Sequence, residues 1–182
     1  GAYCTFVNGG INTKPFFITR IEDKNGNVIE NFVPKTKEAI SEQTAYKMVF
    51  MLKGGVEESG GTSVGLPLEL KKDNEIGGKT GTTNDASDGW YIGVTHDLVT
   101  GIWVGGDERA IHFPSWPMGQ GGSSARPIWA KFMTKVYKDP TTGITKGQFK
   151  RPSSGLDISL DRYKEPTDSV KVKDYEPEDI KN

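Results

Sequence analysis

Two segments of the chain repeat their apolar residues with the spacing of an α-helix. In the first, residues 42–53, one helical face collects Ala45, Met48, Val49 and Leu52. Ser41 stands just before this segment and can cap the helix, because its hydroxyl can accept a hydrogen bond from a free backbone N–H. Gly54 and Gly55 follow the segment and are predicted to end the helix.

The second helical segment covers residues 125–138. Its apolar stripe consists of Trp129, Phe132, Met133 and Val136. Ser124 is the expected cap, and Pro127 lies in the first turn, where a missing N–H costs little. Pro140 follows and is expected to end the helix.

Between these helices the pattern becomes that of β-strands. Residues 75–83, 89–95 and 99–106 are rich in β-branched, aromatic and small residues, and they follow one another closely. Only residues 96–98 join the last two segments, which predicts that these two form an antiparallel hairpin.

Another hairpin is predicted nearer the start of the chain. Residues 16–21 and 27–33 are strand-like, and Asn25-Gly26 supplies the residues that a tight primed turn requires. Strands and helices together predict an α+β fold, in which an antiparallel sheet has helices packed on its faces.

The remaining segments are polar. Residues 56–74 and 107–122 are predicted to be loops, because glycine and charged or polar residues dominate them. After about residue 150 the chain is polar with charges of both signs. Residues 1–150 are therefore predicted to form the structured domain, and residues 151–182 a mobile tail or linker.

Composition and charge exclude several classes of function. The 182 residues carry a formal net charge of −1, which gives no electrostatic case for nucleic-acid binding. No apolar run is long enough to span a bilayer, so no membrane contact is expected of these residues. The single cysteine, Cys4, is predicted to be a small buried apolar residue. His96 and His112 have no further ligand at metal-binding spacing, so neither a metal nor another cofactor is expected.

The segment Lys79-Thr80-Gly81-Thr82-Thr83 is the strongest candidate for a binding site. On a strand, Lys79, Gly81 and Thr83 share one face, and Thr80 and Thr82 share the other. At a sheet edge, glycine lets a ligand backbone approach, and free backbone groups can pair with an extended substrate. The hydroxyls and the ammonium can hold a carboxylate, and the ammonium favours the deprotonated form of a nearby nucleophile. A plain strand with β-favouring threonines explains the same residues.

Ser63 is a competing candidate nucleophile. The stretch from Gly61 to Gly65 fits the Gly-x-Ser-x-Gly nucleophile elbow, and the acids and bases of a hydrolase follow it in order as Asp85, Asp88, His96 and His112. An elbow requires a strand before the serine and a helix after it. Here the polar stretch "GGVEESG" precedes the motif and "LPLEL" follows it. A glycine-rich surface loop is therefore the favoured interpretation.

The wider context of the Lys-Thr-Gly segment resembles one protein family. "GGKTGTTNDASDGWYIGVTHDLVTGIWVGGDE" resembles the third-motif region of the class A, bifunctional penicillin-binding proteins of the 1A type. "GAYCTFVNGG", "FFITRIEDKNGNVIE" and "GGSSARPIWAKFM" resemble other segments of that family in the same order, over residues 1–150. Gly106 departs from the family, which usually has an aromatic residue there, and this difference is expected to alter local packing.

The resemblance implies a peptidoglycan D,D-transpeptidase, which cross-links stem peptides through a serine acyl-enzyme and is acylated by β-lactams. Lys79 is then the third-motif lysine, and Thr80 and Thr82 bind the substrate carboxylate from a strand that also includes Gly81 and Thr83. The N–H of Thr82 is one oxyanion donor, so Lys79 and Thr82 are the candidate catalytic residues.

The family's nucleophilic serine lies upstream of the helix end with which this chain opens. None of the serines here has a lysine three positions later, so no Ser-x-x-Lys motif is present. We therefore expect this chain to be the C-terminal part of a transpeptidase domain, to be inactive alone, and to require the upstream half of the same domain.

The resemblance also implies where the longer protein works. It places that protein on the extracytoplasmic face of a bacterial inner membrane, anchored through an upstream segment and carrying a glycosyltransferase domain. A β-lactamase or D,D-carboxypeptidase shares Lys-Thr-Gly and remains an alternative. A non-catalytic cell-wall binding module is another alternative, and an upstream Ser-x-x-Lys motif would argue against it.

Overall fold

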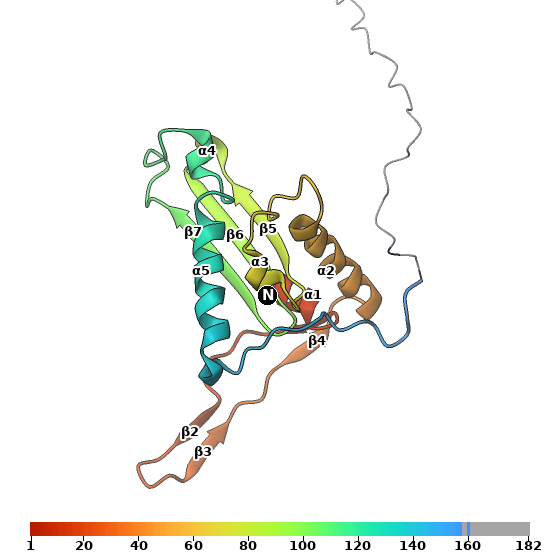
Figure 1. Cartoon of the computed structure of the whole chain (residues 1–182). Helices are drawn as coiled ribbons and strands as arrows, with labels where there is room; N and C mark the ends of the chain where they lie inside the picture. Colours follow the sequence, from red (N-terminus) through yellow and green to blue (C-terminus); the bar gives the residue numbers. More distant parts are fainter. Residues whose placement is uncertain (158–159, 161–182) are drawn as a thin grey trace, which may run out of the picture.

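A three-stranded antiparallel sheet forms the centre of the structure. The computed structural model describes residues 1–157 and 160. The strands β5 (Gly77–Thr82), β6 (Asp88–Val94) and β7 (Val99–Gly105) lie in the order β5-β6-β7 (Figure 1). The three predicted consecutive strands and their antiparallel pairing are confirmed.

Helix α5 (Ala125–Lys138) covers one face of this sheet (Figure 1). The indole of Trp129 packs edge-to-face on Tyr91 of β6, with ring centroids 5.4 Å apart. The predicted helix is confirmed, but its predicted cap is wrong. The hydroxyl of Ser124 donates to the carbonyl oxygen of Gln120, 2.9 Å away, and accepts no bond from the helix.

Helix α2 (Glu42–Glu57) begins where the sequence predicts and packs against β5. Its cap is confirmed, because Ser41 Oγ accepts a hydrogen bond from the N–H of Thr44 at 3.2 Å. The helix nevertheless continues through Gly54 and Gly55, so the prediction that this glycine pair ends it is wrong.

The glycines of α2 and β5 have a packing role instead. A Cβ atom at Gly55 would lie 3.1 Å from the carbonyl oxygen of Gly78 on β5. A Cβ atom at Gly77 would lie 2.9 Å from Cβ of Leu52 on the helix. Helix and strand therefore approach more closely than larger residues would allow.

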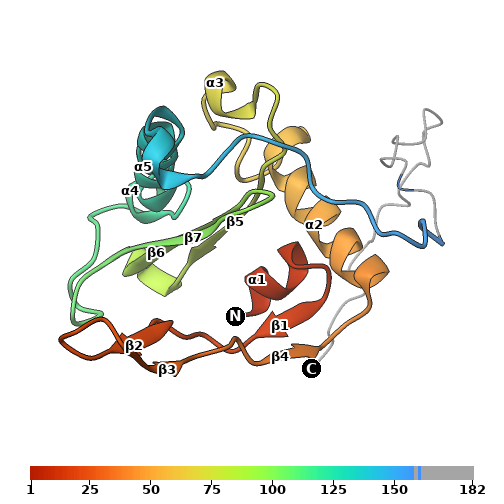
Figure 2. The same ribbon diagram turned by 90° about the horizontal axis from the view of Figure 1, so that it is seen from below.

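The first forty residues form a helix and two small sheets. Helix α1 (Ala2–Val7) confirms the helix end predicted at the start of the chain. Strand β1 (Ile11–Thr13) pairs with β4 (Thr36–Glu38), and β2 (Arg20–Glu22) pairs with β3 (Val28–Asn31) as a hairpin beyond them (Figure 2). The predicted hairpin is present, although its strands are shorter than expected.

The turn of this hairpin differs from the predicted one. A primed turn of type I′ needs positive φ at both central residues, but of the pair Asn25-Gly26 only Gly26 has it, at +84°. The carbonyl oxygen of Asp23 accepts a hydrogen bond from the N–H of Gly26, and the N–H of Asp23 donates to the carbonyl oxygen of Asn27. This is a three-residue loop with glycine in the left-handed position.

Three further expectations require correction. The segment 56–74 contains the last residues of α2 and a short helix, α3 (Leu68–Lys71). The segment 107–122 contains another, α4 (Trp116–Gly119). Cys4 is exposed and not buried, and the residues of α1 that pack against the core are instead Tyr3, Phe6 and Val7. A 3₁₀ turn, η2 (Pro140–Thr142), follows α5.

The segment after α5 returns to the start of α2. The N–H and hydroxyl of Ser153 both donate to Glu42, at 2.9 and 2.8 Å. Lys47 and Asp157 form an ion pair at 2.6 Å. These residues belong to the predicted tail, 151–182, most of which lies outside the described residues.

Within the described part of the chain, no helix combines the length and apolar character needed to cross a membrane.

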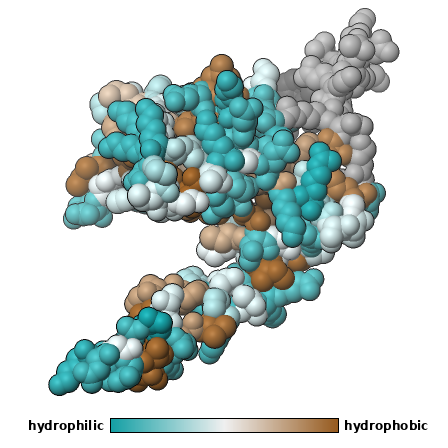
Figure 3. All heavy atoms as spheres, turned by 60° about the horizontal axis from the view of Figure 1, so that its bottom comes forward, coloured by the Kyte–Doolittle hydropathy of each residue, from teal (hydrophilic) through white to brown (hydrophobic). Residues whose placement is uncertain are grey.

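The sheet face opposite α5 is open. Trp90 and Trp103 lie next to each other on it, and each remains 44% exposed. In Figure 2, α1 lies under only part of this face. Figure 3 shows open space between the β2–β3 arm and the body. The chain leading into that arm also exposes apolar side chains, most of all Phe17, at 95%.

The contact between α5 and the sheet can be tested at Gly93, which lies under the indole of Trp129. A Cβ atom there would be 2.2 Å from the ring. Gly93→Ala is therefore expected to lower the free energy of unfolding by about 1–3 kcal/mol, since the indole has to move. Urea unfolding measures this change. Gly122→Ala is the matched control, because its Cβ would have 3.7 Å to the nearest atom. Equal stability of the two variants would contradict the described packing.

Candidate active site

The predicted binding segment lies on an edge strand. In the order β5-β6-β7, only one side of β5 is paired with another strand of its sheet. The N–H of Thr83 donates to the carbonyl of Asp88 at 3.1 Å. In an antiparallel pair of strands, residues that bond to the partner strand alternate with residues that do not, so this bond shows which residues of β5 face β6. The N–H and C=O groups of Thr80 and Thr82 therefore face away from β6. Among the described residues the one hydrogen bond found for these groups is from the Lys79 ammonium to the carbonyl oxygen of Thr80, at 2.8 Å.

The side chains of this strand divide between the two faces. Thr80 pairs with Tyr91, whose ring lies on the α5 side, so the side chains of Thr80 and Thr82 share that side. Lys79 and Gly81 share the open face with Trp90. The free backbone edge thus lies between a row of hydroxyls and an exposed ammonium.

The loop before α5 orients the hydroxyl of Thr82. The N–H of Gly121 donates to Thr82 Oγ1 at 3.1 Å. The hydroxyl accepts this bond, so its own proton remains available for a ligand. Glycine is required at 121, because a Cβ would lie 2.2 Å from the carbonyl oxygen of Trp90 and 2.6 Å from that of Gly81.

Asp88 holds the end of β5, and sequence reasoning missed this role. Its Oδ2 accepts hydrogen bonds from the hydroxyls of Thr83 and Ser87, both at 3.1 Å, and its Oδ1 accepts from the indole N–H of Trp103 at 2.9 Å. One carboxylate therefore connects all three strands. These bonds lower the pKa of Asp88 below its ordinary value, and the bond from Trp103 has the largest effect.

The turn between β5 and β6 has an unusual backbone. Within the 3₁₀ turn η1 (Asn84–Ala86), Asp85 and Ala86 have φ of +59° and +53°. Residues other than glycine seldom adopt such angles. Ala86 is buried against Gly119, where a Cβ would lie 2.5 Å away. Sequence offered no sign of this, since neither residue is a glycine.

Ser63 is fully buried, so the expected surface loop is wrong at this position. Its N–H donates to the carbonyl of Gly55, and its Oγ lies with the hydroxyl of Tyr91 beneath Gly78. Burial raises the pKa of Tyr91, and the Ser63 hydroxyl partly offsets this effect. The element directly before Ser63 is helix α2 and not a strand, and the next helix begins only at Leu68. An inaccessible oxygen without that framework gives no support to a hydrolase elbow.

The histidines of the elbow hypothesis lie elsewhere. His112 is exposed, and its Nδ1 lies 2.9 Å from the carbonyl of Phe113. His96 lies beside Asp97, with Nε2 and Oδ2 3.5 Å apart. Among the residues that the structure describes, no group of three His, Cys, Asp or Glu side chains is placed to hold a metal ion.

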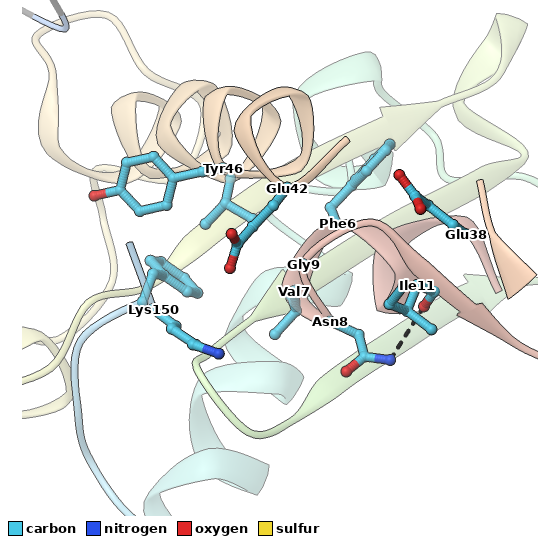
Figure 4. A pocket seen from close by; sticks show the side chains of 11 residues that line it. Phe6, Val7, Asn8, Gly9, Ile11, Glu38, Glu42, Tyr46 and Lys150 are labelled. Atoms are coloured by element: carbon cyan, nitrogen blue, oxygen red, sulfur yellow. Dashed lines mark hydrogen bonds between the residues drawn. The ribbon is translucent and has the colours of Figure 1, made fainter. Parts of the chain in front are cut away.

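A cavity of about 500 Å³ lies away from the predicted segment, between α1, α2 and the returning segment (Figure 4). Glu38, Glu42 and Lys150 line it together with apolar side chains. Glu42 already accepts two hydrogen bonds from Ser153, and these lower its pKa. None of its lining residues lies on β5, so the cavity is not part of the candidate site.

Comparison with known proteins identifies the family. The family described as the penicillin binding protein transpeptidase domain matches residues 1–134. The chain belongs to this family. Penicillin-binding protein 1A of Aquifex aeolicus is 37% identical over 140 residues, and penicillin-binding protein 2D of Bacillus subtilis is 30% identical over 167. These matches cover 75% and 80% of the chain, but only 18% and 23% of the relatives.

Solved structures agree with this assignment. Penicillin-binding protein 1A of Haemophilus influenzae matches with a TM-score of 0.63 and 25% identity, over 76% of this chain and 26% of that one. Penicillin-binding protein A of M. tuberculosis, at 23% identity and a TM-score of 0.52, shares the fold. The resemblance to the 1A type and the α+β fold are therefore confirmed, and the chain is a portion of a transpeptidase domain.

The Asp88 network predicts an acid-dependent loss of stability. Because the folded pKa of Asp88 is lowered, its contribution is complete above the unfolded pKa of about 3.9 and disappears as pH falls through the folded value. Asp88→Asn, which cannot ionise, is expected to have a lower Tm than the unaltered chain at pH 6, and the difference should shrink at pH 2–3.

Thermal unfolding followed by circular dichroism across this pH range measures both quantities. Asp73→Asn is a suitable control, since no hydrogen bond or ion pair of the Asp73 carboxylate is found among the described residues. A Tm difference for Asp88→Asn that stays constant with pH would contradict the role of its charge.

Proposed function

We propose that this chain provides the Lys-Thr-Gly side of the active site of a peptidoglycan D,D-transpeptidase. The observation that carries the proposal is the free edge of β5, where the N–H of Thr82 has no partner among the described residues. An extended stem peptide can pair with this edge as an added strand. Membership of the transpeptidase family supports the same interpretation.

The proposed roles follow from the positions on the strand. The hydroxyls of Thr80 and Thr82 bind the terminal carboxylate, and the bond from Gly121 keeps the Thr82 proton available for this purpose. Gly81 lets the substrate backbone come close, and Thr83 fixes the end of the strand through Asp88. The exposed ammonium of Lys79 favours ionisation of the nucleophile.

In the proposed reaction a serine Oγ attacks the carbonyl between two D-alanines and expels the terminal one. The oxyanion that forms accepts a hydrogen bond from the N–H of Thr82, and a second donor is the N–H of the serine itself. The acyl group then passes to an amine of another stem peptide. β-Lactams acylate the same serine, and the M. tuberculosis protein that shares this fold has been solved as an imipenem acyl-enzyme complex.

The nucleophile is proposed to come from a preceding part of the same domain, since these 182 residues contain no Ser-x-x-Lys motif. That part would also cover the open sheet face around Trp90 and Trp103 and fill the space beside the β2–β3 arm. An extracytoplasmic location, a membrane anchor and a glycosyltransferase domain belong to the same proposal for the longer protein.

Lys79 offers a direct test in the complete domain. Lys79→Ala is expected to slow acylation by a fluorescent penicillin by about 10²–10³-fold, as is typical when one preorganised electrostatic group is removed. Lys72→Ala is the matched control, because Lys72 is an exposed lysine at the end of α3. Stopped-flow fluorescence gives the rate constants. Unchanged acylation in Lys79→Ala would refute the assigned role.

The isolated 182-residue chain provides the second test. It is expected to form no covalent adduct with labelled penicillin, because removal of the nucleophile removes the covalent intermediate altogether. A denaturing gel of this chain, run beside the complete domain, measures the adduct. A labelled band at the mass of the chain would mean that one of its own serines is the nucleophile.

A further inference from the structure

A groove on the α5 side of the molecule, lined by no residue of β5, has the chemistry of a peptide-binding site. It lies between α5 and the segment that leads into α3, two elements that are in contact, and has a volume of about 550 Å³. Leu66 and Ala130 are buried in its floor, while Pro67 and Pro127 form apolar walls.

All the charged residues that line this groove are basic. Its charged lining residues are Arg126, Lys131 and Lys135, and no Asp or Glu lines it. The whole chain has a net charge of −1, so three cations around one groove are a local concentration of positive charge. Lys131 and Lys135 are four residues apart on α5, where like charges destabilise a helix, and neither has an ion pair among the described residues.

Arg126 is already held in position at one end of the groove. One guanidinium nitrogen, Nη1, donates to the carbonyl oxygen of Thr62 at 2.8 Å. The group lies over Gly65, where a Cβ would come within 2.7 Å of Nη2. Because a guanidinium has five N–H donors, the remaining ones can bind a carboxylate without further ordering of the side chain.

We propose that this groove binds the acidic segment 174–180 of the same chain, Asp-Tyr-Glu-Pro-Glu-Asp-Ile, in an extended conformation. The segment carries four carboxylates, at positions 174, 176, 178 and 179. In an extended chain Asp174, Glu176 and Glu178 would face one side, and Tyr175, Pro177 and Asp179 the other. Three of the four carboxylates would then meet the basic side chains while Tyr175 and Pro177 rest on the floor.

The sequence also meets the geometric requirements of this proposal. A residue before proline favours extended backbone, which is the conformation required at Glu176. From Leu160 to Asp174 an extended chain of 14 residues can reach at most about 50 Å, so the tether does not confine the acidic segment to the surroundings of Leu160. A tethered segment also has a high effective concentration at its site, so individually weak surface ion pairs are sufficient.

A spin label placed after the acidic segment tests the proposal in the full chain. Cys4→Ser removes the native thiol, and Lys181→Cys receives a nitroxide. Docking predicts loss of amide NMR signal for residues 65, 66, 126 and 128–135, and retention of signal for β2 and β3. Raising the salt to 1 M, where the Debye length is about 3 Å, should restore the lost signals. Signal loss that is absent, or spread evenly over the molecule, overturns the proposal.

Charge reversal provides the matched comparison. Lys131→Glu/Lys135→Glu is expected to abolish the signal loss, while Lys35→Glu/Lys37→Glu, near the β2–β3 arm, should leave it unchanged. Glu176→Lys/Glu178→Lys should abolish it as well, without touching the folded body, and combining this change with the α5 reversal should restore it. Failure of both single reversals to weaken the effect overturns the proposal.

A mixed sample identifies the occupant. Spin-labelled chain without isotope is combined with ¹⁵N-labelled chain that carries no spin label. An acidic segment bound within its own chain leaves the ¹⁵N signals unchanged. Loss of amide signal at residues 126 and 128–135 of the ¹⁵N-labelled chain would show that its groove binds the acidic segment of another copy. That result would overturn the assignment to the same chain.

Discussion

Close packing around β5 is the constraint on which the candidate site depends. Gly55 of α2 rests against Gly78 on the free side of the strand, and Gly121 closes on Gly81 from the α5 side. A side chain at any of these contacts would push its neighbour away from the strand. With glycine there, the strand is supported from two directions, while the backbone of Thr80 and Thr82 stays uncovered.

Two polar contacts fix the orientation of groups on this supported strand. The N–H of Gly121 donates to the Thr82 hydroxyl and so orients it. Asp88 holds the end of the strand by accepting a hydrogen bond from Thr83. Both act on groups beside the free N–H of Thr82. Hydrogen-bond donors aimed at a future charge are effective because they need not reorganise during a reaction. In the proposed transpeptidase, the described residues would orient the substrate, and a preceding part of the domain would provide the nucleophile.

The elements of the sheet could be predicted from the sequence because their signals are local. β-Branched, aromatic and small residues in close succession marked β5, β6 and β7, and an apolar stripe marked α5. The meaning of single residues could not be predicted in the same way. Gly54 and Gly55 look like a helix end by composition, but a strand distant in sequence gives Gly55 its packing role. Ser63 reads as a surface serine, although its burial beneath Gly78 depends on three separate segments.

The candidate site shows the same division. Lys79 to Thr83 could be proposed from the sequence because the motif is contiguous and resembles that of a known family. Asp88 and Gly121 were missed because their roles arise from contacts across strands and loops, which spacing along one chain does not reveal. The strained turn at Asp85 and Ala86 was missed for another reason, since residue type gave no indication of positive φ.

The order of the three strands has a consequence for how the site forms during folding. Residues 83–87 and 95–98 close the two hairpins, so β5, β6 and β7 can pair through short loops. The contact from Gly121 to Thr82 spans 39 residues and carries a larger loop-closure cost. We therefore expect the strand to be in place before its hydroxyl is aimed. Substitutions in the 119–124 loop should then slow the step in which the Thr82 hydroxyl becomes oriented. The earlier pairing of β5, β6 and β7 should be unaffected.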